Sequence, residues 1–222
     1  MSSPERKVSN TKIDAAGALI RTSLLDDGAL SPQVDDAIEV IGAFRSSHST
    51  VMDLVTQRVS EFGTTVIPGV PAVSNRLKRF RQMMMKLLAR ESMRLSQMSD
   101  IAGCRLIGGA DDLALIAVQL RQHLEVIDED DYREAPRSSG YRAHHIIVRQ
   151  EGFRVEVQLR TPAEHAWAAW VEDISRSGRW GSPKDDRAHP DLLRALRRVS
   201  DALATGTMDA DDFVQIRNEF LK

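Results

Sequence analysis

The hydrophobic period of this 222-residue chain changes in its middle and then changes back. Residues 101–107, 144–149 and 153–160 are short runs, apolar or alternating, of the kind typical of β-strands. Patterns of helical period precede and follow these runs. Strands flanked by helices at both ends of a chain predict an α/β or α+β domain built on a mixed central β-sheet.

The expected elements can be placed by period and by turn residues. A short strand is expected over residues 124–127, and residues 134–140, rich in proline, serine and glycine, predict a loop. Asp111 or Asp112 can cap the helix that follows the first strand. The expected helices are residues 12–25, 33–61, 76–94, 111–123, 162–176, 190–204 and 209–220.

Composition excludes several classes of protein. Cys104 is the only cysteine, which excludes a disulfide scaffold and a multi-cysteine zinc site. No apolar run approaches the roughly 18–20 residues that a membrane span needs. The first twelve residues are polar, with no apolar signal segment behind them. We therefore expect a cytoplasmic protein with no membrane partner.

Positive charge is concentrated in one segment of a chain whose net charge is only −2. Residues 76–94 contain seven basic residues and one acid. In the expected helix, the basic side chains share one face and the apolar ones the other. Such a face can be a solvated surface, which charge alone favours, or a cradle for a polyphosphate. The basic set is Lys78, Arg79, Lys86 and Arg90, and the apolar set is Phe80, Met84, Leu87 and Leu88.

Two acidic residues lie beside strands where a carboxylate could have a chemical role. Alternation in residues 155–161 places Glu156, Gln158 and Arg160 on one face, which either meets water or forms the floor of a cleft. A carboxylate there can bind Mg²⁺ or accept a proton. Asp100 opens the first strand and is either a turn residue or a second such carboxylate. Gly103 within that strand indicates close approach of another backbone or of a ligand.

The loop before the second strand offers an aromatic ring beside basic residues. Gly140 gives the backbone freedom, and Tyr141 suits stacking on a nucleobase or partial burial in an ordinary hairpin loop. His144 and His145 are adjacent in a strand and face opposite ways, so they do not form a convincing metal site.

In this order the blocks resemble the synthetase domain of the RelA/SpoT family, most closely its small, single-domain alarmone synthetases. The resemblance covers about residues 70–175. It rests on Arg76-x-Lys78 with Lys86, on Asp100-Ile101-Ala102-Gly103-x-Arg105, on Gly140-Tyr141-Arg142 with His145, and on Val155-Glu156-Val157-Gln158-Leu159-Arg160-Thr161.

The resemblance implies a fold and an activity. The fold is a mixed sheet with helices on its sides, similar to nucleotidyltransferases. Residues 1–70 would be an N-terminal helical extension, residues 71–176 the synthetase core, and residues 177–222 C-terminal helices packing on that core. The activity is Mg²⁺-dependent transfer of the terminal pyrophosphate of ATP to the 3′-hydroxyl of GDP or GTP.

The resemblance also implies residue roles. Asp100 and Glu156 would hold Mg²⁺, and Glu156 would help deprotonate the attacking hydroxyl. Tyr141 would stack on the guanine, with Arg137 and His145 near the acceptor's phosphates. The residues expected to bind ATP are Arg76, Lys78, Lys86 and Arg105, and those expected to complete the acceptor site are Gly140, Arg142, Gln158 and Arg160.

Departures from the family pattern leave the acceptor open. Gln82 replaces a serine, Arg137 and Ser139 replace a lysine and an asparagine, and Ala143-His144 replaces a Ser-Leu pair. Two alternative acceptors are the 3′-CCA end of tRNA, for which Arg194, Arg197 and Arg198 leave room, and an adenosine nucleotide. A third alternative is a nucleotide-binding or RNA-binding module without catalysis, against which the presence of both carboxylates argues.

No His-Asp dipeptide of the family's hydrolase domain occurs in the sequence. We therefore expect synthesis of alarmone without its degradation. An unopposed synthetase can inhibit growth, which is compatible with a toxin neutralised by an antitoxin protein. The resemblance is also compatible with a homo-oligomer.

Overall fold

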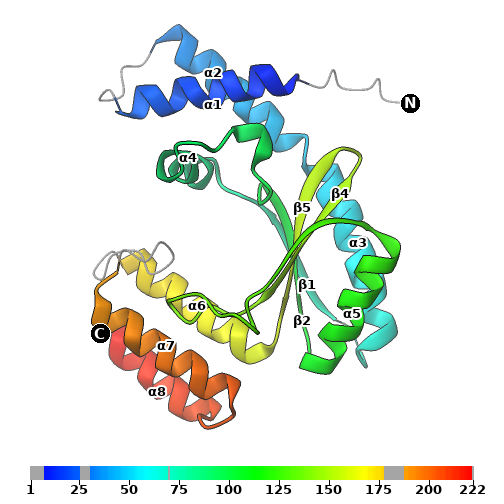
Figure 1. Cartoon of the computed structure of the whole chain (residues 1–222), viewed down its shortest axis with the longest axis vertical. Coiled ribbons are helices and arrows are strands. Elements are labelled where there is room, and N and C mark those ends of the chain that lie inside the picture. Colours follow the sequence, from blue (N-terminus) through cyan, green and yellow to red (C-terminus); the bar gives the residue numbers. More distant parts are fainter. Residues whose placement is uncertain (1–7, 26–30, 70, 178–187, 222) are drawn as a thin grey trace. The chain divides into compact units, whose positions relative to one another are not determined.

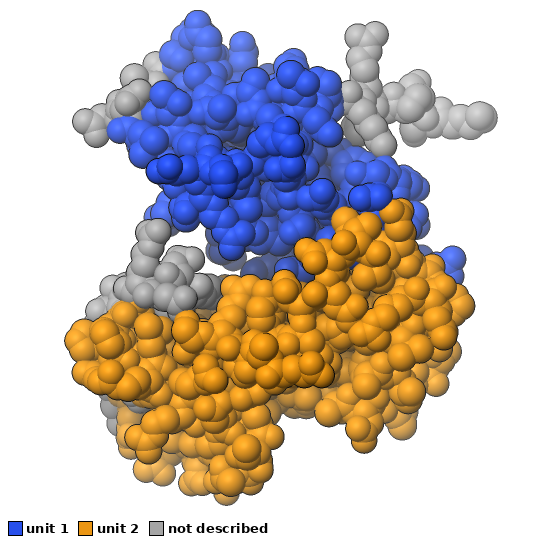
Figure 2. All heavy atoms as spheres, viewed as in Figure 1, with its two compact units in different colours: residues 1–58, 74–104, 147–156 blue, residues 59–73, 105–146, 157–222 orange. Residues whose placement is uncertain are grey.

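The computed structural model describes residues 8–25, 31–69, 71–177 and 188–221. The chain divides into two compact units, which Figure 2 colours separately. Within the described ranges, no helix is both long and apolar enough to cross a bilayer. Unit 1 comprises residues 1–58, 74–104 and 147–156, and unit 2 comprises residues 59–73, 105–146 and 157–222.

Five strands form one sheet in the order β1-β2-β5-β4-β3 (Figure 1). A tight turn at Glu151 and Gly152, both with positive φ, joins β4 to β5 as a hairpin. Helices flank the sheet, so the predicted α/β (α+β) class with a mixed central sheet is confirmed. The strands are β1 Ala72–Leu77, β2 Ala102–Ile107, β3 Glu125–Asp131, β4 His144–Gln150 and β5 Phe153–Arg160.

β3 is longer than the strand expected over residues 124–127, because it continues through an acidic run to Asp131. The strand lies at one edge of the sheet, and most of its side chains are exposed or half-buried. Charged side chains on an edge strand discourage pairing with another chain. The acidic run thus suits this edge, although its composition alone favours a loop.

The single helix expected over residues 33–61 is wrong, because the segment forms α2 and α3 with a break at Ser47 and His48. His48 is buried, its Nδ1 lies 2.8 Å from the carbonyl oxygen of Phe44, and its ring packs edge-on against Phe44 and Phe153. This packing is a long-range requirement that the helical period does not contain. The three N-terminal helices are α1 Asn10–Leu25, α2 Pro32–Ser46 and α3 Ser49–Val66.

The helix expected over residues 76–94 is wrong in its first part. Arg76 lies in β1, and α4 spans only Phe80–Ala89. The amide of Lys78 donates to the carbonyl of Ile101 at 2.7 Å, and Arg45 Nε donates to the carbonyl of Lys78 at 2.7 Å. Such bonds to distant residues can override local helical preference.

This correction also removes the expected cationic helix face. Of its four members only Lys86 lies on α4, since Lys78 and Arg79 precede the helix and Arg90 follows it. The apolar face is confirmed for Met84 and Leu87, which are buried, although the fully buried Met83 was not expected there.

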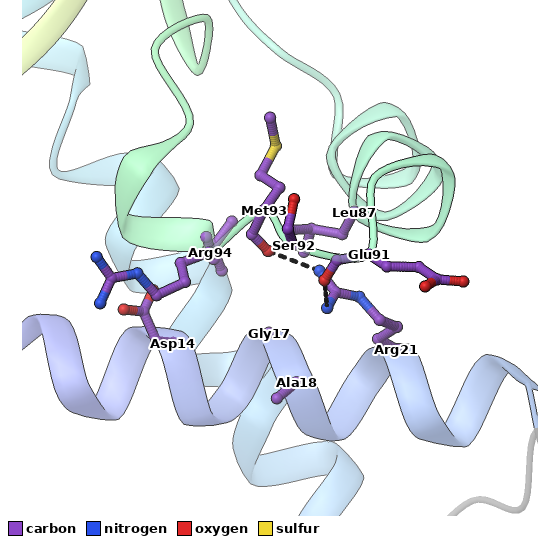
Figure 3. A pocket seen from close by; sticks show the side chains of 10 residues that line it. Asp14, Gly17, Ala18, Arg21, Leu87, Glu91, Ser92, Met93 and Arg94 are labelled. Carbon is purple, nitrogen blue, oxygen red and sulfur yellow. Dashed lines mark hydrogen bonds between the residues drawn. The ribbon is translucent and has the colours of Figure 1, made fainter.

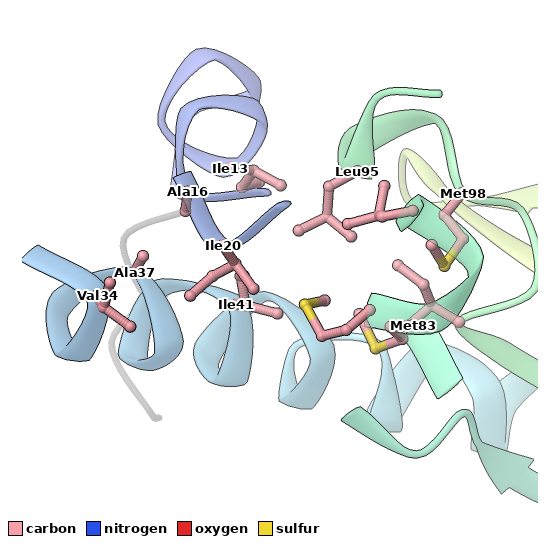
Figure 4. Close-up of a cluster of buried hydrophobic side chains, with 12 residues drawn as sticks. Ile13, Ala16, Ile20, Val34, Ala37, Ile41, Met83, Leu95 and Met98 are labelled. Carbon is pink, nitrogen blue, oxygen red and sulfur yellow. The ribbon is translucent and has the colours of Figure 1, made fainter. Parts of the chain in front are cut away.

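An apolar cluster in unit 1 joins α1 and α2 to α4 (Figure 4). Gly17 allows α1 to approach the short 3-10 helix η1 (Leu95–Gln97), since a Cβ at Gly17 would lie 3.0 Å from Leu95 Cβ. The cluster consists of Ile13, Ala16, Ile20, Val34, Ala37, Ile41, Met83, Met84, Leu87, Leu95, Met98 and Ile101.

Unit 2 contains the remaining helices, and α6, α7 and α8 pack side by side (Figure 1). Thr161 and Glu164 form a capping box at the start of α6, with backbone-to-side-chain bonds of 2.8 and 3.2 Å. The prediction that an aspartate caps α5 is wrong, because the N-cap residue is Gly109. Asp111 and Asp112 lie in the first turn of the helix. The helices are α5 Ala110–His123, α6 Pro162–Ser177, α7 Pro190–Ala204 and α8 Ala210–Leu221.

Candidate active site

A carboxylate and two lysines form a compact ionic group in unit 1. Asp100 lies in the turn before β2, Lys78 directly follows β1, and Lys86 lies on α4. Lys78 Nζ is 2.8 Å from Asp100 Oδ2, and Lys86 Nζ is 2.8 Å from Asp100 Oδ1. Each of the three side chains exposes about a fifth of its surface. The structure thus brings together three residues that the sequence had assigned to one site.

The two lysines keep Asp100 ionised. Burial raises the pKa of Asp100, but the nearby charges and hydrogen bonds of Lys78 and Lys86 outweigh it, so that the pKa lies below its usual range. The group therefore combines an ionised carboxylate, a type of group that can bind a cation, with two ammonium groups, which can bind an anion.

Glu156 lies mid-strand on β5, next to β2. A Cβ built at Gly103 would be 3.1 Å from the carbonyl oxygen of Glu156 and 3.7 Å from its Cβ, which confirms the predicted close approach of a backbone at Gly103. The Cβ contact also means that Glu156 leaves the sheet on the face of Gly103. Val155 and Val157 are fully buried on the other face, while Glu156 is half-buried.

The remaining residues expected to bind ATP lie in different settings. Arg76 is exposed on β1, whereas Arg105 is half-buried on β2.

In unit 2, burial lowers the pKa of His165 on α6, and the charges of Arg105 and Arg160 lower it further. His165 was not predicted as a site residue, since a lone histidine on a helix carries no sequence signal.

Four of the residues expected at the acceptor site form one hydrogen-bonded group, in which two of them contact the hydroxyl of Tyr141. Arg160 Nη2 donates to this hydroxyl at 2.7 Å, and His145 Nε2 lies 2.6 Å from it. Arg160 also donates to Gln158 Oε1 at 2.9 Å. Arg160 is 6% exposed, so a buried guanidinium orients the tyrosine ring.

A second aromatic residue joins this cluster. Arg137 lies over the ring of Tyr132 at 4.4 Å and donates to its hydroxyl at 2.8 Å, and it also lies 5.6 Å from the centre of the Tyr141 ring. Tyr132 packs edge-on against His145 at 5.2 Å. Sequence reasoning missed Tyr132, because it lies beside an acidic run and outside the blocks that carry the resemblance.

Gly140 and Arg142, also expected at the acceptor site, contact α7. A Cβ at Gly140 would lie 2.9 Å from Arg197 Cα and from Ser200 Cβ, and the φ of Gly140 is +88°. Arg142 Nη2 donates to Asp201 Oδ1 at 2.7 Å. Both residues therefore attach the loop that carries Tyr141 to α7.

His144 and His145 take separate partners, as the alternation of a strand requires. His144 is 3% exposed and bonds to Glu129 on β3 and to Arg133, whose Nη2 is 3.0 Å from His144 Nδ1. His145 belongs to the Tyr141 cluster.

A small cavity of about 100 Å³ lies in unit 1 between α1 and the segment after α4 (Figure 3). Arg21 closes one side by donating to the carbonyls of Glu91 and Met93, each at 2.7 Å. The cavity contains none of the residues assigned to chemistry from the sequence. Its lining is Asp14, Gly17, Ala18, Arg21, Leu87, Glu91, Ser92, Met93, Arg94 and Leu95.

Most of the sheet and both groups of polar residues lie in the part of the chain that matches a known family model. Residues 75–174 match the family model described as "Region found in RelA / SpoT proteins". This part of the chain is therefore similar to the family, and the resemblance drawn from the four sequence blocks is confirmed.

Characterised and uncharacterised relatives share parts of the chain. It is 32% identical over 131 residues to an uncharacterised protein of Mycobacterium tuberculosis. The aligned region covers 55% of this chain and 45% of that protein. It is 33% identical over 85 residues to GTP pyrophosphokinase YjbM of Bacillus subtilis, covering 33% of this chain and 40% of that enzyme. The chain thus spans less than half the length of these relatives.

Solved structures share the fold. The small alarmone synthetase 1 of Bacillus subtilis bound to its product pppGpp superposes with a TM-score of 0.63 at 20% identity, over 82% of this chain and 98% of that one. A GTP pyrophosphokinase family protein of Streptococcus pneumoniae superposes with a TM-score of 0.61 at 17% identity, over 86% and 96% of the two chains. The five-stranded sheet with its helices is thus the fold of these proteins.

Proposed function

We propose that this chain is a pyrophosphokinase that transfers the β,γ-pyrophosphate of ATP to the 3′-hydroxyl of GDP or GTP, without hydrolase activity. The observation that carries the proposal is the half-buried Asp100, kept ionised between Lys78 and Lys86. The names of two relatives, a GTP pyrophosphokinase and an alarmone synthetase bound to pppGpp, support the choice of acceptor. The division into an extension over residues 1–70, a core over 71–176 and C-terminal helices over 177–222 remains part of this proposal.

On the ATP side, positive charge is the main catalytic resource. Attack on the β-phosphorus increases the charge on its oxygens and on the departing AMP, and cations placed beforehand stabilise that charge. We assign this role to Lys78 and Lys86, which already lie together, and to Arg76 and Arg105.

The residues present fit a magnesium ion. Asp100 supplies ionised carboxylate oxygens, Glu156 supplies a second carboxylate on β5, and Mg²⁺ in nucleotide enzymes commonly uses one or two carboxylates plus phosphates and water. Among the described residues no cluster of three or more potential ligands occurs, so phosphate oxygens would complete the coordination. Bound there, the ion would neutralise charge on the ATP phosphates.

On the acceptor side, Tyr141 would stack on the guanine, with Arg137 and His145 near the phosphates. The hydrogen bonds from Arg160 and His145 to its hydroxyl hold the ring before the nucleotide binds. Pre-orientation of this kind lowers the entropic cost of binding.

The proposed step is a single displacement. The 3′-oxygen of the acceptor forms a bond to the β-phosphorus, the bond from that phosphorus to the oxygen bridging to the α-phosphorus breaks, and AMP departs. The proton of the hydroxyl passes to the carboxylate of Glu156 as the new bond forms.

A second acceptor class, the 3′-CCA end of tRNA, is favoured by one observation. Arg197 on α7 donates to the carbonyl of Arg137 at 3.2 Å, so a helix that also carries the exposed Arg194 lies against residues 137–142, which we call the acceptor loop. Arginines spread along a helix can bind several phosphates of a polynucleotide backbone, whereas a single nucleotide would contact fewer of them.

The test is incubation of the full chain with γ-labelled ATP and Mg²⁺, separately with GDP, GTP, ATP or deacylated tRNA. We expect label in GDP or GTP and release of AMP. The variant Glu156→Gln serves as the blank, and omission of Mg²⁺ tests the metal. If only tRNA gained label, the acceptor would be tRNA and not a guanosine nucleotide. If only a pyrophosphorylated product of ATP formed, the product would be an adenosine alarmone. Absence of transfer to every acceptor would refute the assignment as a pyrophosphokinase.

A further inference from the structure

The loop that carries Tyr141 rests on α7, a helix outside the residues that match the family model. Gly140 is the point of closest approach, because its missing side chain leaves room for Arg197 Cα and Ser200 Cβ, each 2.9 Å from where a Cβ would be. Ser200 Oγ donates to the carbonyl of Gly140 at 2.5 Å, and Ser200 is 4% exposed. The residue before Tyr141 is thus fixed from the side of α7.

The residue after Tyr141 is fixed by the same helix. Arg142 Nη2 donates to Asp201 Oδ1 at 2.7 Å, its Nε donates to Ser200 Oγ at 3.3 Å, and its Nη1 donates to the carbonyl of Arg133 at 2.8 Å. The arginine therefore links the turn after β3 to α7 and spans the acceptor loop.

α7 is itself held in place by α6. The indole of Trp167 donates to the carbonyl of Leu196 at 3.0 Å in a buried setting, and the ring of Trp167 lies 6.4 Å from that of Tyr141. An apolar cluster that includes Leu192, Leu196 and Val199 covers the same helix face. Ser200 and Asp201 therefore project from a well-packed support.

We propose that α7 sets the position of Tyr141, and that Ser200 and Asp201 are positioning residues for the acceptor nucleotide. The inference rests on the proposed function for its catalytic consequence. Neither residue need touch substrate: Ser200 holds Gly140 on one side of Tyr141, and Ser200 and Asp201 together hold Arg142 on the other side. Loss of either bond leaves the loop folded but lets the ring move, and misplacement of an orienting group weakens binding.

Three variants test this inference. Ser200→Ala removes the two bonds of Ser200 Oγ, to Gly140 and from Arg142, and Asp201→Asn removes the charge that pairs with Arg142, whereas Asp201→Glu keeps that charge. Asp191→Asn, at the start of the same helix, is the matched control, since Asp191 pairs with Arg194 within α7. We expect Ser200→Ala and Asp201→Asn to raise the acceptor's KM about tenfold while the KM of ATP stays within about twofold. Asp201→Glu should restore most of the acceptor's KM, and Asp191→Asn should leave both values unchanged.

Amide hydrogen exchange separates the failure of this inference from the failure of the proposed function. The amide of Gly140 donates to the carbonyl of Arg137 at 2.8 Å, and we expect its exchange to accelerate in Ser200→Ala and Asp201→Asn but not in Asp191→Asn. Unchanged exchange overturns the inference whatever the assays show. Faster exchange with an equal rise in both KM values refutes the role in positioning the acceptor, and a wild-type enzyme without transferase activity refutes the proposed function and that role together.

Discussion

Lys78 Nζ and Asp100 Oδ2 lie 2.8 Å apart, at the points where β1 ends and β2 is about to begin. The backbone bond from the amide of Lys78 to the carbonyl of Ile101 ties the same two segments together. The side-chain pair and the start of the strand pairing are therefore one structural unit, so that changes at Asp100 should affect stability as well as chemistry.

Replacement of Asp100 should destabilise the fold. Asp100→Asn leaves two largely buried ammonium groups without their carboxylate, and we expect a loss of about 1–3 kcal/mol in the free energy of unfolding at pH 7. Urea denaturation measures it. Asp36→Asn, at an exposed position of α2, should change the same quantity by less than about 0.5 kcal/mol. Equal stabilities for wild type and Asp100→Asn would contradict the energetic role of the pair.

The effect of Asp100→Asn should depend on pH in a defined direction. The pKa of Asp100 in the folded protein lies below the value of about 3.9 expected in the unfolded chain, so the ionised side chain stabilises the fold above that pH. This contribution is lost as the pH falls through the folded-state pKa. Unfolding measured from pH 7 down to pH 3 should therefore show the two proteins converging in stability, and a constant gap would argue against a depressed pKa.

Glu156 should matter for turnover and not for ATP affinity. Glu156→Gln keeps the size of the side chain and removes the group that accepts the proton, so we expect kcat to fall by about 10²–10⁴-fold with the dissociation constant of ATP little changed. Single-turnover transfer and calorimetric titration with ATP give the two values. Glu39→Gln, on an exposed turn of α2, is the matched control and should behave as wild type. Unchanged turnover in Glu156→Gln would remove Glu156 from the chemistry.

A methyl group at Gly140 should be costly for two separable reasons. Gly140→Ala introduces a Cβ at positive φ and places it 2.9 Å from two atoms of α7, whereas Gly206→Ala has positive φ but nothing within 4 Å. We expect about 1 kcal/mol of destabilisation for Gly206→Ala and more than about 2 kcal/mol for Gly140→Ala. Thermal or chemical unfolding of both variants checks this. Similar costs at the two positions would mean that the loop moves freely away from α7.

The single thiol should be inert until the protein unfolds. Burial raises the pKa of Cys104 to about 12, so the reactive thiolate is scarce at pH 8 and the sulfur is shielded as well. Alkylation by iodoacetamide should be slow in the native protein and should reach the rate of a free thiol in denaturing urea, as followed by mass spectrometry. Rapid native modification would mean that β2 opens locally.

The sequence sufficed for β2, β3, β4 and β5 and for the C-terminal helices because their signals are local, whereas β1 was not expected. Alternation in β5, the Glu151-Gly152 turn and the Thr161–Glu164 capping box each require only neighbouring residues. The errors at residues 33–61 and 76–94 have long-range causes. The break between α2 and α3 lies at His48, whose ring packs against the distant Phe153. Lys78 lies outside a helix, and its amide donates to the carbonyl of the distant Ile101.

The candidate site divides in the same way. Lys78, Lys86 and Asp100 were each expected from sequence and do meet, and Tyr141, His145, Gln158 and Arg160 meet in a second group. The sequence could not distinguish residues that face the site from residues that hold its loop, since that distinction depends on α7. Gly140 and Arg142 were accordingly expected to contact the acceptor, whereas their contacts in the structure are with Ser200 and Asp201.

The alternation of β5 has a genetic consequence. Val155, Val157 and Leu159 are fully buried, while Glu156 and Gln158 emerge on the opposite face. Side chains alternate along a strand, so deletion of one codon between the hairpin turn and Glu156 would move each following side chain to the opposite face. The strand would then either bury Glu156 and Gln158 or lose its pairing with β2 and β4. Length changes in this strand should therefore be tolerated only in steps of two residues, which would leave the register of the proposed catalytic base intact.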